Sequence, residues 1–230
     1  MTSQLMDVLA DEPRVVLCDL TGMAAAGAAV ADMFAPAVSY LADWPGTVVV
    51  VTAPDAAVRS ALESAALRAE RLFVQAGSEI GPAEAHDRLP RLRRSTLQLS
   101  PQATAPRQAR DFVVRTLDDW GMASLSSAAC LVVSELVTNS ILHAVTVMDL
   151  RLSMAEGRVR VAVRDRGGGR PSARPGEATQ HTLDGRGLQL VQAFARSWGV
   201  IPAPARGKTV WAVLDGADAL ATSGSPRRSR

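Results

Sequence analysis

The segment SELVTNSILHA, residues 134–144, carries three polar side chains at four-residue spacing, namely Glu135, Asn139 and His143. Residues four apart share one face of an α-helix, so this spacing predicts a helix with a polar stripe. The opposite face is predicted to be buried and carries Val133, Leu136, Val137, Ser140 and Ala144. A carboxylate and a carboxamide one turn apart can together orient an attacking group and bind a hydrated divalent cation. The alternative is an ordinary amphipathic helix whose Glu135 and Asn139 are only solvated.

Two glycine-rich segments follow this helix in the sequence. In VAVRDRGGGRP, Asp165 ends a short β-branched run and is followed by Gly167, Gly168 and Gly169. In DGRGLQLVQAFARSWGV, two glycines at 185 and 187 stand at the start of an apolar helical stretch. Glycines let the backbone approach a ligand closely, and a helix N-terminus presents unpaired N–H groups with a partial positive charge. The second segment can therefore hold phosphate groups by backbone contacts alone.

In this order and at this spacing, the three motifs resemble the nucleotide-binding boxes of the GHKL ATPase superfamily. That superfamily groups gyrase, heat-shock chaperone, histidine kinase and mismatch-repair ATPases. The likeness is greatest for the branch of anti-sigma-factor serine/threonine kinases, and it covers about residues 95 to 215. The resemblance implies a Bergerat-type ATP site with ATP and Mg²⁺ as cofactors.

The resemblance also implies which residues contact the adenine base. Asp165 would accept a hydrogen bond from the exocyclic amine, a donor that guanine lacks at that position. Gly167 and Gly169 would let the backbone come close to the ring. Thr209, in GKTVW, matches the family's supporting hydroxyl near the same edge of the base.

Further roles concern the phosphates and the transfer step. Asn139 would be the magnesium ligand, with waters and phosphate oxygens completing the octahedron. Glu135 would be the general base for a partner's hydroxyl. Residues 169–184 would form a lid over the phosphates, and Lys208 is a weaker candidate for phosphate contact. The phosphates would lie against the helix start formed by Gly185, Arg186, Gly187 and Leu188.

Composition limits the remaining classes of function. The chain has 230 residues, enough for one large domain or two of about a hundred each. A net charge of +2 gives no reason to expect nucleic-acid binding. The two cysteines, Cys18 and Cys130, lie far apart in apolar runs, which favours free thiols in a reducing compartment. With no signal-peptide pattern and no uninterrupted apolar stretch of about 18 residues, we expect a cytoplasmic protein without a membrane partner.

Residues 1–80 are predicted to form a small parallel α/β layer with apolar strands near 13–20, 47–52 and 72–75. Through VVLCDLTG and PDAAVRSALESAAL, this order resembles the STAS domain of anti-sigma-factor antagonists. Where such antagonists carry Asp-Ser-Ser-Gly or a variant, this chain has alanine at 24–26 followed by Gly27, so no hydroxyl is present to accept a phosphoryl group. We interpret 1–80 as a degenerate STAS-like domain used for contact or assembly, with a plain α/β appendage as the alternative.

The rest of the chain divides into a linker at 81–94, an ATP-binding domain at 95–216 and a disordered tail at 217–230. Strands are predicted at 95–99 and 209–214, with an antiparallel hairpin of 147–154 and 158–165. Helices are expected at 102–120 and from Leu188 through Trp198. A third, capped by Ser124 or Ser126, is the one that carries Glu135 and Asn139. The fold class is therefore α+β, an α/β sandwich with helices on one face of an antiparallel sheet.

The sequence thus predicts an ATP-dependent protein serine/threonine kinase that phosphorylates an antagonist (STAS) protein and regulates transcription through partner switching. A sigma factor is a further candidate partner, and the resemblance suggests a homodimer. The alternative is a non-catalytic module that captures a protein partner under the control of bound nucleotide. Autophosphorylation or simple ATP hydrolysis is a third option, whereas a histidine kinase is disfavoured because the chain before the domain is α/β rather than a phosphoacceptor helix.

Overall fold

The computed structural model describes residues 4–5, 8–9, 11–21, 27–44, 46–66, 71–77, 79–87, 89–167, 185–202 and 207–216. The chain forms two compact units, Met1–Leu92 and Arg93–Arg230, and each is considered by itself. The alanines at 24–26, the expected lid at 169–184 and the expected tail at 217–230 lie outside the described residues.

The first unit contains a three-stranded parallel sheet in the order β1-β2-β3. Its strands are β1 (Val15–Asp19), β2 (Val48–Thr52) and β3 (Leu72–Gln75), which confirms the predicted parallel layer. Valines 48–51 are all buried, as expected for the central strand of a sheet that is covered on both faces.

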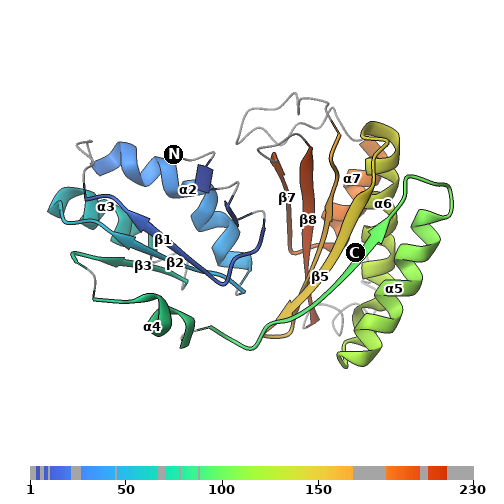
Figure 1. The fold of residues 1–230 in the computed structure, drawn as a ribbon, viewed down its shortest axis with the longest axis horizontal. Coiled ribbons are helices and arrows are strands. Elements are labelled where there is room, and N and C mark those ends of the chain that lie inside the picture. Colours follow the sequence, from blue (N-terminus) through green and yellow to red (C-terminus); the bar gives the residue numbers. More distant parts are fainter. Residues whose placement is uncertain are drawn as a thin grey trace, which may run out of the picture. The chain divides into compact units, whose positions relative to one another are not determined.

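Helices cover both faces of this small sheet. Helices α2 (Gly27–Asp43) and α3 (Ala56–Ala66) lie over one face, and α4 (Pro82–Asp87) lies across the other (Figure 1). Helix α4 occupies the segment that we expected to be a linker, and its Ala85 packs against Val48 and Val50. The expectation of a linker at 81–94 is therefore corrected in part: residues 82–87 form a helix on the core of the first unit, and Arg93 and Arg94 begin β4.

The second unit is built on a five-stranded antiparallel sheet in the order β4-β5-β6-β8-β7. Strands β5 and β6 form the predicted hairpin. Its two turn residues, Glu156 and Gly157, have φ values of 50° and 73°, the left-handed conformation that two-residue hairpin turns require. The strands are β4 (Arg93–Leu99), β5 (Met148–Ala155), β6 (Arg158–Arg164), β7 (Ser197–Pro202) and β8 (Lys208–Asp215).

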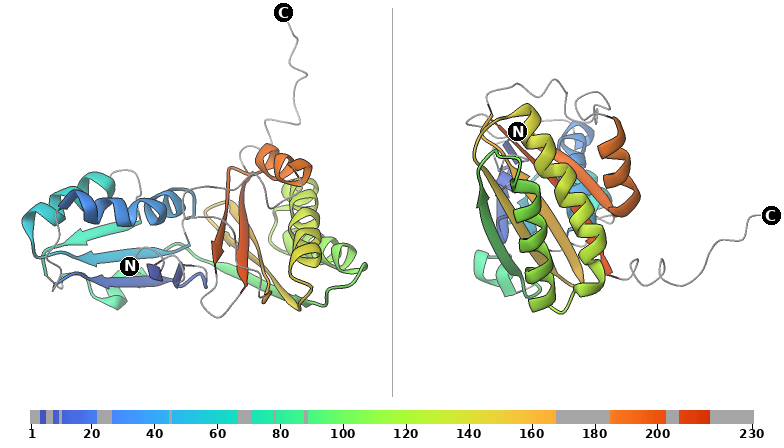
Figure 2. Two further views of the ribbon diagram at one scale, coloured as in Figure 1. Left: turned by 90° about the horizontal axis from the view of Figure 1, so that it is seen from above. Right: turned by 90° about the vertical axis from the view of Figure 1, so that its right-hand side faces the viewer.

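Three α-helices cover one face of this sheet, as Figure 2 shows most clearly. They are α5 (Ala105–Asp119), α6 (Ser126–His143), preceded by the short 3₁₀ helix η1 (Ala123–Leu125), and α7 (Gly185–Phe194). Alternate residues of the central strands point toward the helices and form the core, among them Leu150, Leu152, Val159, Val161, Val163, Val210, Ala212 and Leu214. The α+β fold class with helices on one sheet face is confirmed.

Helix α6 lies in the centre of this helical layer. Its buried residues are Ala129, Val132, Val133, Leu136, Val137, Asn139 and Ser140. The segment Ala123–His143 is long and apolar enough to cross a membrane, but core helices meet the same criterion, and this one packs on the sheet. The wide apolar face therefore follows from its position in the core.

Two expectations about helix ends are wrong. Neither Ser124 nor Ser126 caps α6, because Leu125 occupies the N-cap position and no side chain bonds there. Helix α7 begins at Gly185 rather than at Leu188, and Trp198 belongs to β7 rather than to the helix. The helical spacing of apolar residues extends by chance to Trp198, although α7 ends at Phe194 and β7 begins at Ser197.

Both cysteines are free thiols, as predicted. Burial raises the pKa of the Cys18 thiol above its usual value, and burial is also the main cause of the raised pKa of Cys130. Both side chains are therefore packing residues with little thiolate at neutral pH.

Candidate functional site

The Asp165 carboxylate lies at the C-terminal end of β6 and is only 1% exposed. Its Oδ1 accepts hydrogen bonds from the backbone N–H groups of Gly167, at 3.3 Å, and of Lys208, at 3.2 Å. The Asp165 N–H in turn donates to the Lys208 carbonyl at 3.0 Å, which extends the pairing of β6 with β8. The two bonds to Oδ1 orient the carboxylate, and the third holds the Asp165 backbone against β8.

The second carboxylate oxygen of Asp165 has a different environment. Oδ2 is buried and accepts no hydrogen bond from the described residues. The Lys208 ammonium lies 3.3 Å away, close enough for an ion pair although not aligned as a hydrogen bond. A buried acceptor without a hydrogen-bond donor is costly unless a ligand supplies one, so Oδ2 is available for a donor group of a bound molecule.

A second pair of unpaired polar atoms lies in α6. Asn139 is 8% exposed, and neither its Oδ1 nor its Nδ2 has a hydrogen-bond partner among the described residues. Glu135, one turn earlier, is partly exposed, and His143 is exposed. The three residues of the predicted polar stripe therefore differ in exposure. Asn139 belongs to the buried face, so water does not solvate its carboxamide, and a ligand can supply the hydrogen-bond partners.

The chain after β6 approaches the end of α6 closely at Gly167. A Cβ atom on Gly167 would lie 2.7 Å from Ala144 Cβ and 2.9 Å from Ala144 Cα. Only glycine allows the segment that follows Asp165 to pass so near the helix end. This contact brings the first two sequence motifs together.

A second glycine, Gly207, supports Asp165 from the other strand. Its φ is +102°, and a Cβ atom there would lie 2.2 Å from the Asp165 carbonyl oxygen. No expected role fell on Gly207. It stands directly before β8, the strand that pairs with β6, and this position is the sequence feature that could have pointed to it.

We expect Gly207→Ala to destabilise the second unit more than Gly121→Ala. Both glycines have positive φ, so both substitutions carry a conformational cost of about 1 kcal/mol. Only at Gly207 would the new methyl group also collide with backbone, since a Cβ on Gly121 meets nothing within 4 Å. Thermal melts of the two variants measure the difference, and equal melting temperatures would contradict a tight β6–β8 junction.

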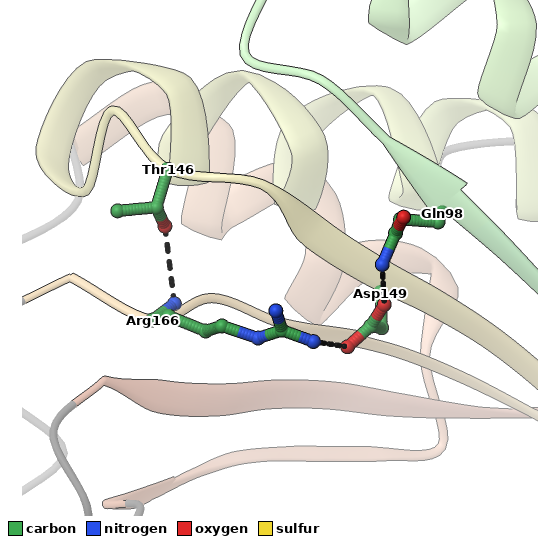
Figure 3. A network of polar contacts seen from close by, with 4 residues as sticks. All are labelled: Gln98, Thr146, Asp149 and Arg166. Atoms are coloured by element: carbon green, nitrogen blue, oxygen red, sulfur yellow. Dashed lines mark hydrogen bonds and ion pairs between the residues drawn. The ribbon is translucent and has the colours of Figure 1, made fainter.

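The residue after Asp165 is held by a polar network (Figure 3). The Arg166 N–H donates to Thr146 Oγ1 at 3.1 Å, and the Arg166 guanidinium donates to Asp149 Oδ2 at 3.1 Å. Asp149 Oδ1 also accepts from Gln98 Nε2, at 3.3 Å. The Arg166 side chain is 60% exposed, so its ion pair adds little stability, but the network fixes the path of the chain from Asp165 to Gly167.

The β6–β8 register places Thr209 one position away from the pair formed by Asp165 and Lys208. Thr209 pairs with Arg164 in the β6–β8 register, whereas the neighbouring pair, Val163 and Val210, points into the helix-side core. Because side chains alternate along a strand, Thr209 points to the other sheet face, and Lys208 is the β8 residue beside Asp165. The Thr209 Oγ1 is buried without a partner among the described residues.

The expected phosphate-binding segment is only partly described. The backbone of residues 185–188, which includes Arg186 and Leu188, forms the first turn of α7, and the later residue Val191 packs into the core. Helix α7 packs against α6, the helix that carries Glu135 and Asn139. Gly169 lies outside the described residues.

Comparison with known proteins identifies the family of the second unit. Residues 99–214 match the model of the family described as the histidine kinase-like ATPase domain, a match that begins at the end of β4 and ends within β8. No curated protein matches the chain at a significant level. Since the matched region is just over half of the 230 residues and contains the three motifs of the candidate site, the chain belongs to the histidine kinase-like ATPase domain family.

Proposed function

We propose that this protein binds ATP with Mg²⁺ in the second unit and transfers the γ-phosphoryl group to a serine or threonine of an antagonist (STAS) protein. The observation that carries the proposal is a pair of buried groups, Asp165 Oδ2 and the Asn139 carboxamide, for which no described residue supplies a hydrogen bond. Domains of this GHKL type bind ATP, usually with Mg²⁺. A base with a donor amine and a hydrated cation would satisfy both groups.

The residues present fit these cofactors. Asp165 offers an acceptor oxygen for the adenine amine, and Gly167 leaves room beside it. Asn139 offers an amide oxygen, a ligand type that Mg²⁺ accepts when waters and phosphates complete its shell. ATP, when bound, supplies the phosphoryl group that is transferred.

Glu135 is the residue that we assign as general base. It lies one turn before Asn139 on α6 and, unlike Asn139, is partly exposed, so a protein partner's hydroxyl has access to it. Its carboxylate would take the proton from the serine or threonine hydroxyl as that oxygen bonds to the γ-phosphorus of ATP and ADP leaves. The assignment to a protein substrate rests on the sequence resemblance to anti-sigma-factor kinases. From the same resemblance we propose that the protein acts in the cytoplasm as a homodimer and that its partner switching involves a sigma factor.

The proposal predicts that Asn139→Ala weakens Mg²⁺-dependent ATP binding by about tenfold or more, the effect of losing one ligand and one buried hydrogen-bonding group. Calorimetric titration with ATP in Mg²⁺ and in EDTA measures this. The matched control is Thr138→Ala, because Thr138 is the exposed neighbour on the same helix. Unchanged ATP affinity in Asn139→Ala would remove Asn139 from the site.

The transfer step is tested on the same samples with γ-labelled ATP and purified candidate antagonist proteins. Label on a serine or threonine of one antagonist supports the kinase. Binding without transfer to any antagonist would favour the second candidate, a module that captures its partner under nucleotide control. Label on the protein itself or free phosphate alone would indicate autophosphorylation or hydrolysis.

A further inference from the structure

We propose that Lys208 reads the adenine base together with Asp165, by donating a hydrogen bond from its ammonium group to the ring nitrogen next to the 6-amino group. That nitrogen is N1 on one side of the amine and N7 on the other. The inference rests on the nucleotide binding proposed above. It concerns recognition of the base alone, so it is independent of the kinase step, and it replaces the expected role of Lys208 in phosphate contact.

The backbone places Lys208 on the same sheet face as Asp165. Arg164 pairs with Thr209 in the β6–β8 register. The hydrogen bond from the Asp165 N–H to the Lys208 carbonyl continues this register by one residue. Because side chains alternate along a strand, Lys208 shares its face with Val210, which lies in the core beneath the helices. The Asp165 and Lys208 side chains therefore lie on the helix side of the sheet, at the same end of two neighbouring strands.

The Lys208 ammonium lies beside the carboxylate oxygen that is open to a ligand. Its Nζ is 3.3 Å from Asp165 Oδ2, and this contact is an ion pair that is not aligned as a hydrogen bond. The Lys208 backbone N–H donates to Oδ1 of the same carboxylate at 3.2 Å, which anchors the start of the side chain. The Lys208 side chain is 21% exposed and that of Asp165 is 2% exposed, so most of the pair is removed from water.

The pair offers two different hydrogen-bonding groups at adjacent positions. A carboxylate only accepts hydrogen bonds, whereas an ammonium group has three donors and no acceptor. Because the contact with Oδ2 is not aligned as a hydrogen bond, the ammonium keeps donors for a bound molecule. A ligand that satisfies both groups must present a donor directly next to an acceptor.

Adenine presents this pattern on either side of its amine, because the 6-amino donor is flanked by the acceptors N1 and N7. Asp165 Oδ2 would accept from the amine while the Lys208 ammonium donates to the flanking nitrogen. Two hydrogen bonds of ordinary length, about 2.9 Å, can start from protein atoms this close together. Guanine carries a carbonyl at position 6, which would place an acceptor against Oδ2. The pair is therefore selective for a purine with a 6-amino group.

Two other roles of Lys208 predict different results. If Lys208 only compensates the charge of the buried carboxylate, or if its ammonium contacts the phosphates, its removal weakens every adenine nucleotide by the same factor. Only direct contact with a ring nitrogen makes the loss depend on whether that nitrogen is present. The roles are therefore separated by combining one change in the protein with one change in the base.

The test is calorimetric titration of the full chain with Mg²⁺ and ATP, or with 1-deaza-, 7-deaza- or 3-deaza-ATP, in which C–H replaces one ring nitrogen. For the wild type we expect 1-deaza-ATP or 7-deaza-ATP to bind about tenfold or more weakly than ATP, the effect of losing one charge-assisted hydrogen bond. In Lys208→Met, ATP should lose a similar factor, and that same analogue should bind within about threefold of ATP.

Two controls accompany the test. The nitrogen missing from 3-deaza-ATP is remote from the amine, so its affinity relative to ATP should be the same in wild type and Lys208→Met. Arg158→Met is the matched variant: Arg158 also pairs with a carboxylate, Asp215, at 3.7 Å, but at the opposite end of the β6–β8 pair. This variant should discriminate between ATP and the analogues as the wild type does. Melting temperatures establish that each variant is folded.

Two results would overturn the inference. One is a wild type that binds 1-deaza-ATP and 7-deaza-ATP as tightly as ATP, a result that does not depend on the folding of any variant. The other is a Lys208→Met protein in which the weakened analogue is disfavoured as strongly as in the wild type. A wild type that does not bind ATP would instead refute the proposed ATP site, so the two failures are distinguished by ATP binding alone.

Discussion

Replacing Glu135 with Gln is expected to leave ATP binding within about threefold of wild type while lowering phosphoryl transfer to the protein substrate by about 10²- to 10⁴-fold, the usual contribution of a general base. The glutamine side chain keeps the size of the glutamate but cannot take a proton. Glu135 is partly exposed on α6, whereas the unsatisfied Asn139 carboxamide one turn later is buried, so the two residues have separable roles.

The measurement is the rate of label transfer from γ-labelled ATP at saturating nucleotide, with ATP affinity measured in parallel. Asp118→Asn is the matched control, because it neutralises an exposed carboxylate on α5 of the same unit. If Glu135→Gln and wild type transferred at the same rate, Glu135 would not be the base. If the variant lost ATP binding together with transfer, Glu135 would be part of the nucleotide site.

Asp165→Asn is expected to lower ATP affinity by about 30- to 1000-fold, the effect of leaving a buried group without a suitable partner. An asparagine must place its NH₂ group either toward the backbone N–H groups of Gly167 and Lys208 or toward the base amine. In both orientations two donors face each other. The substitution also leaves the Lys208 ammonium without its carboxylate.

Calorimetry measures the loss, and thermal melts show whether the unit still folds. Asp149→Asn is the control for charge, since Asp149 pairs with the mostly exposed Arg166 in the same network. Removal of such a surface pair should change ATP affinity by less than about fivefold. Equal effects of the two substitutions would mean that Asp165 acts through the local structure and not through contact with the base.

The elements of the second unit follow from local patterns in the sequence. The alternation in residues 147–165, interrupted by Glu156 and Gly157, predicts the β5–β6 hairpin because a two-residue turn with positive φ requires such residues. The strands of the first unit could be predicted in the same way, because a continuous apolar run such as TVVVVT is typical of a strand that is buried on both faces. Helix α4 was missed because a six-residue helix has too few turns to show a period and is stabilised by packing of Ala85.

The candidate site was predictable in its motifs but not in its contacts. Asp165 and Asn139 were expected to bind ligands, and both are buried with polar atoms that no described residue hydrogen-bonds. Thr209 beside the base stays a prediction, and the structure adds that the Lys208 ammonium is the β8 group that lies 3.3 Å from the Asp165 carboxylate. A shift of one residue along a strand exchanges the two faces of a sheet, and the motif GKTVW alone does not specify the face.

By itself, the sequence determined the α+β class, the order of the strands and of the longer helices, and the residue types able to bind a nucleotide, because these depend on periodicity and on chemistry within short segments. Only the tertiary structure decided that Asn139 is buried, that Gly167 passes against Ala144, and that Lys208 faces the Asp165 carboxylate. Each of these facts depends on which strands and helices meet, and at which register. Contacts between residues far apart in the chain arise from packing, which no short segment specifies.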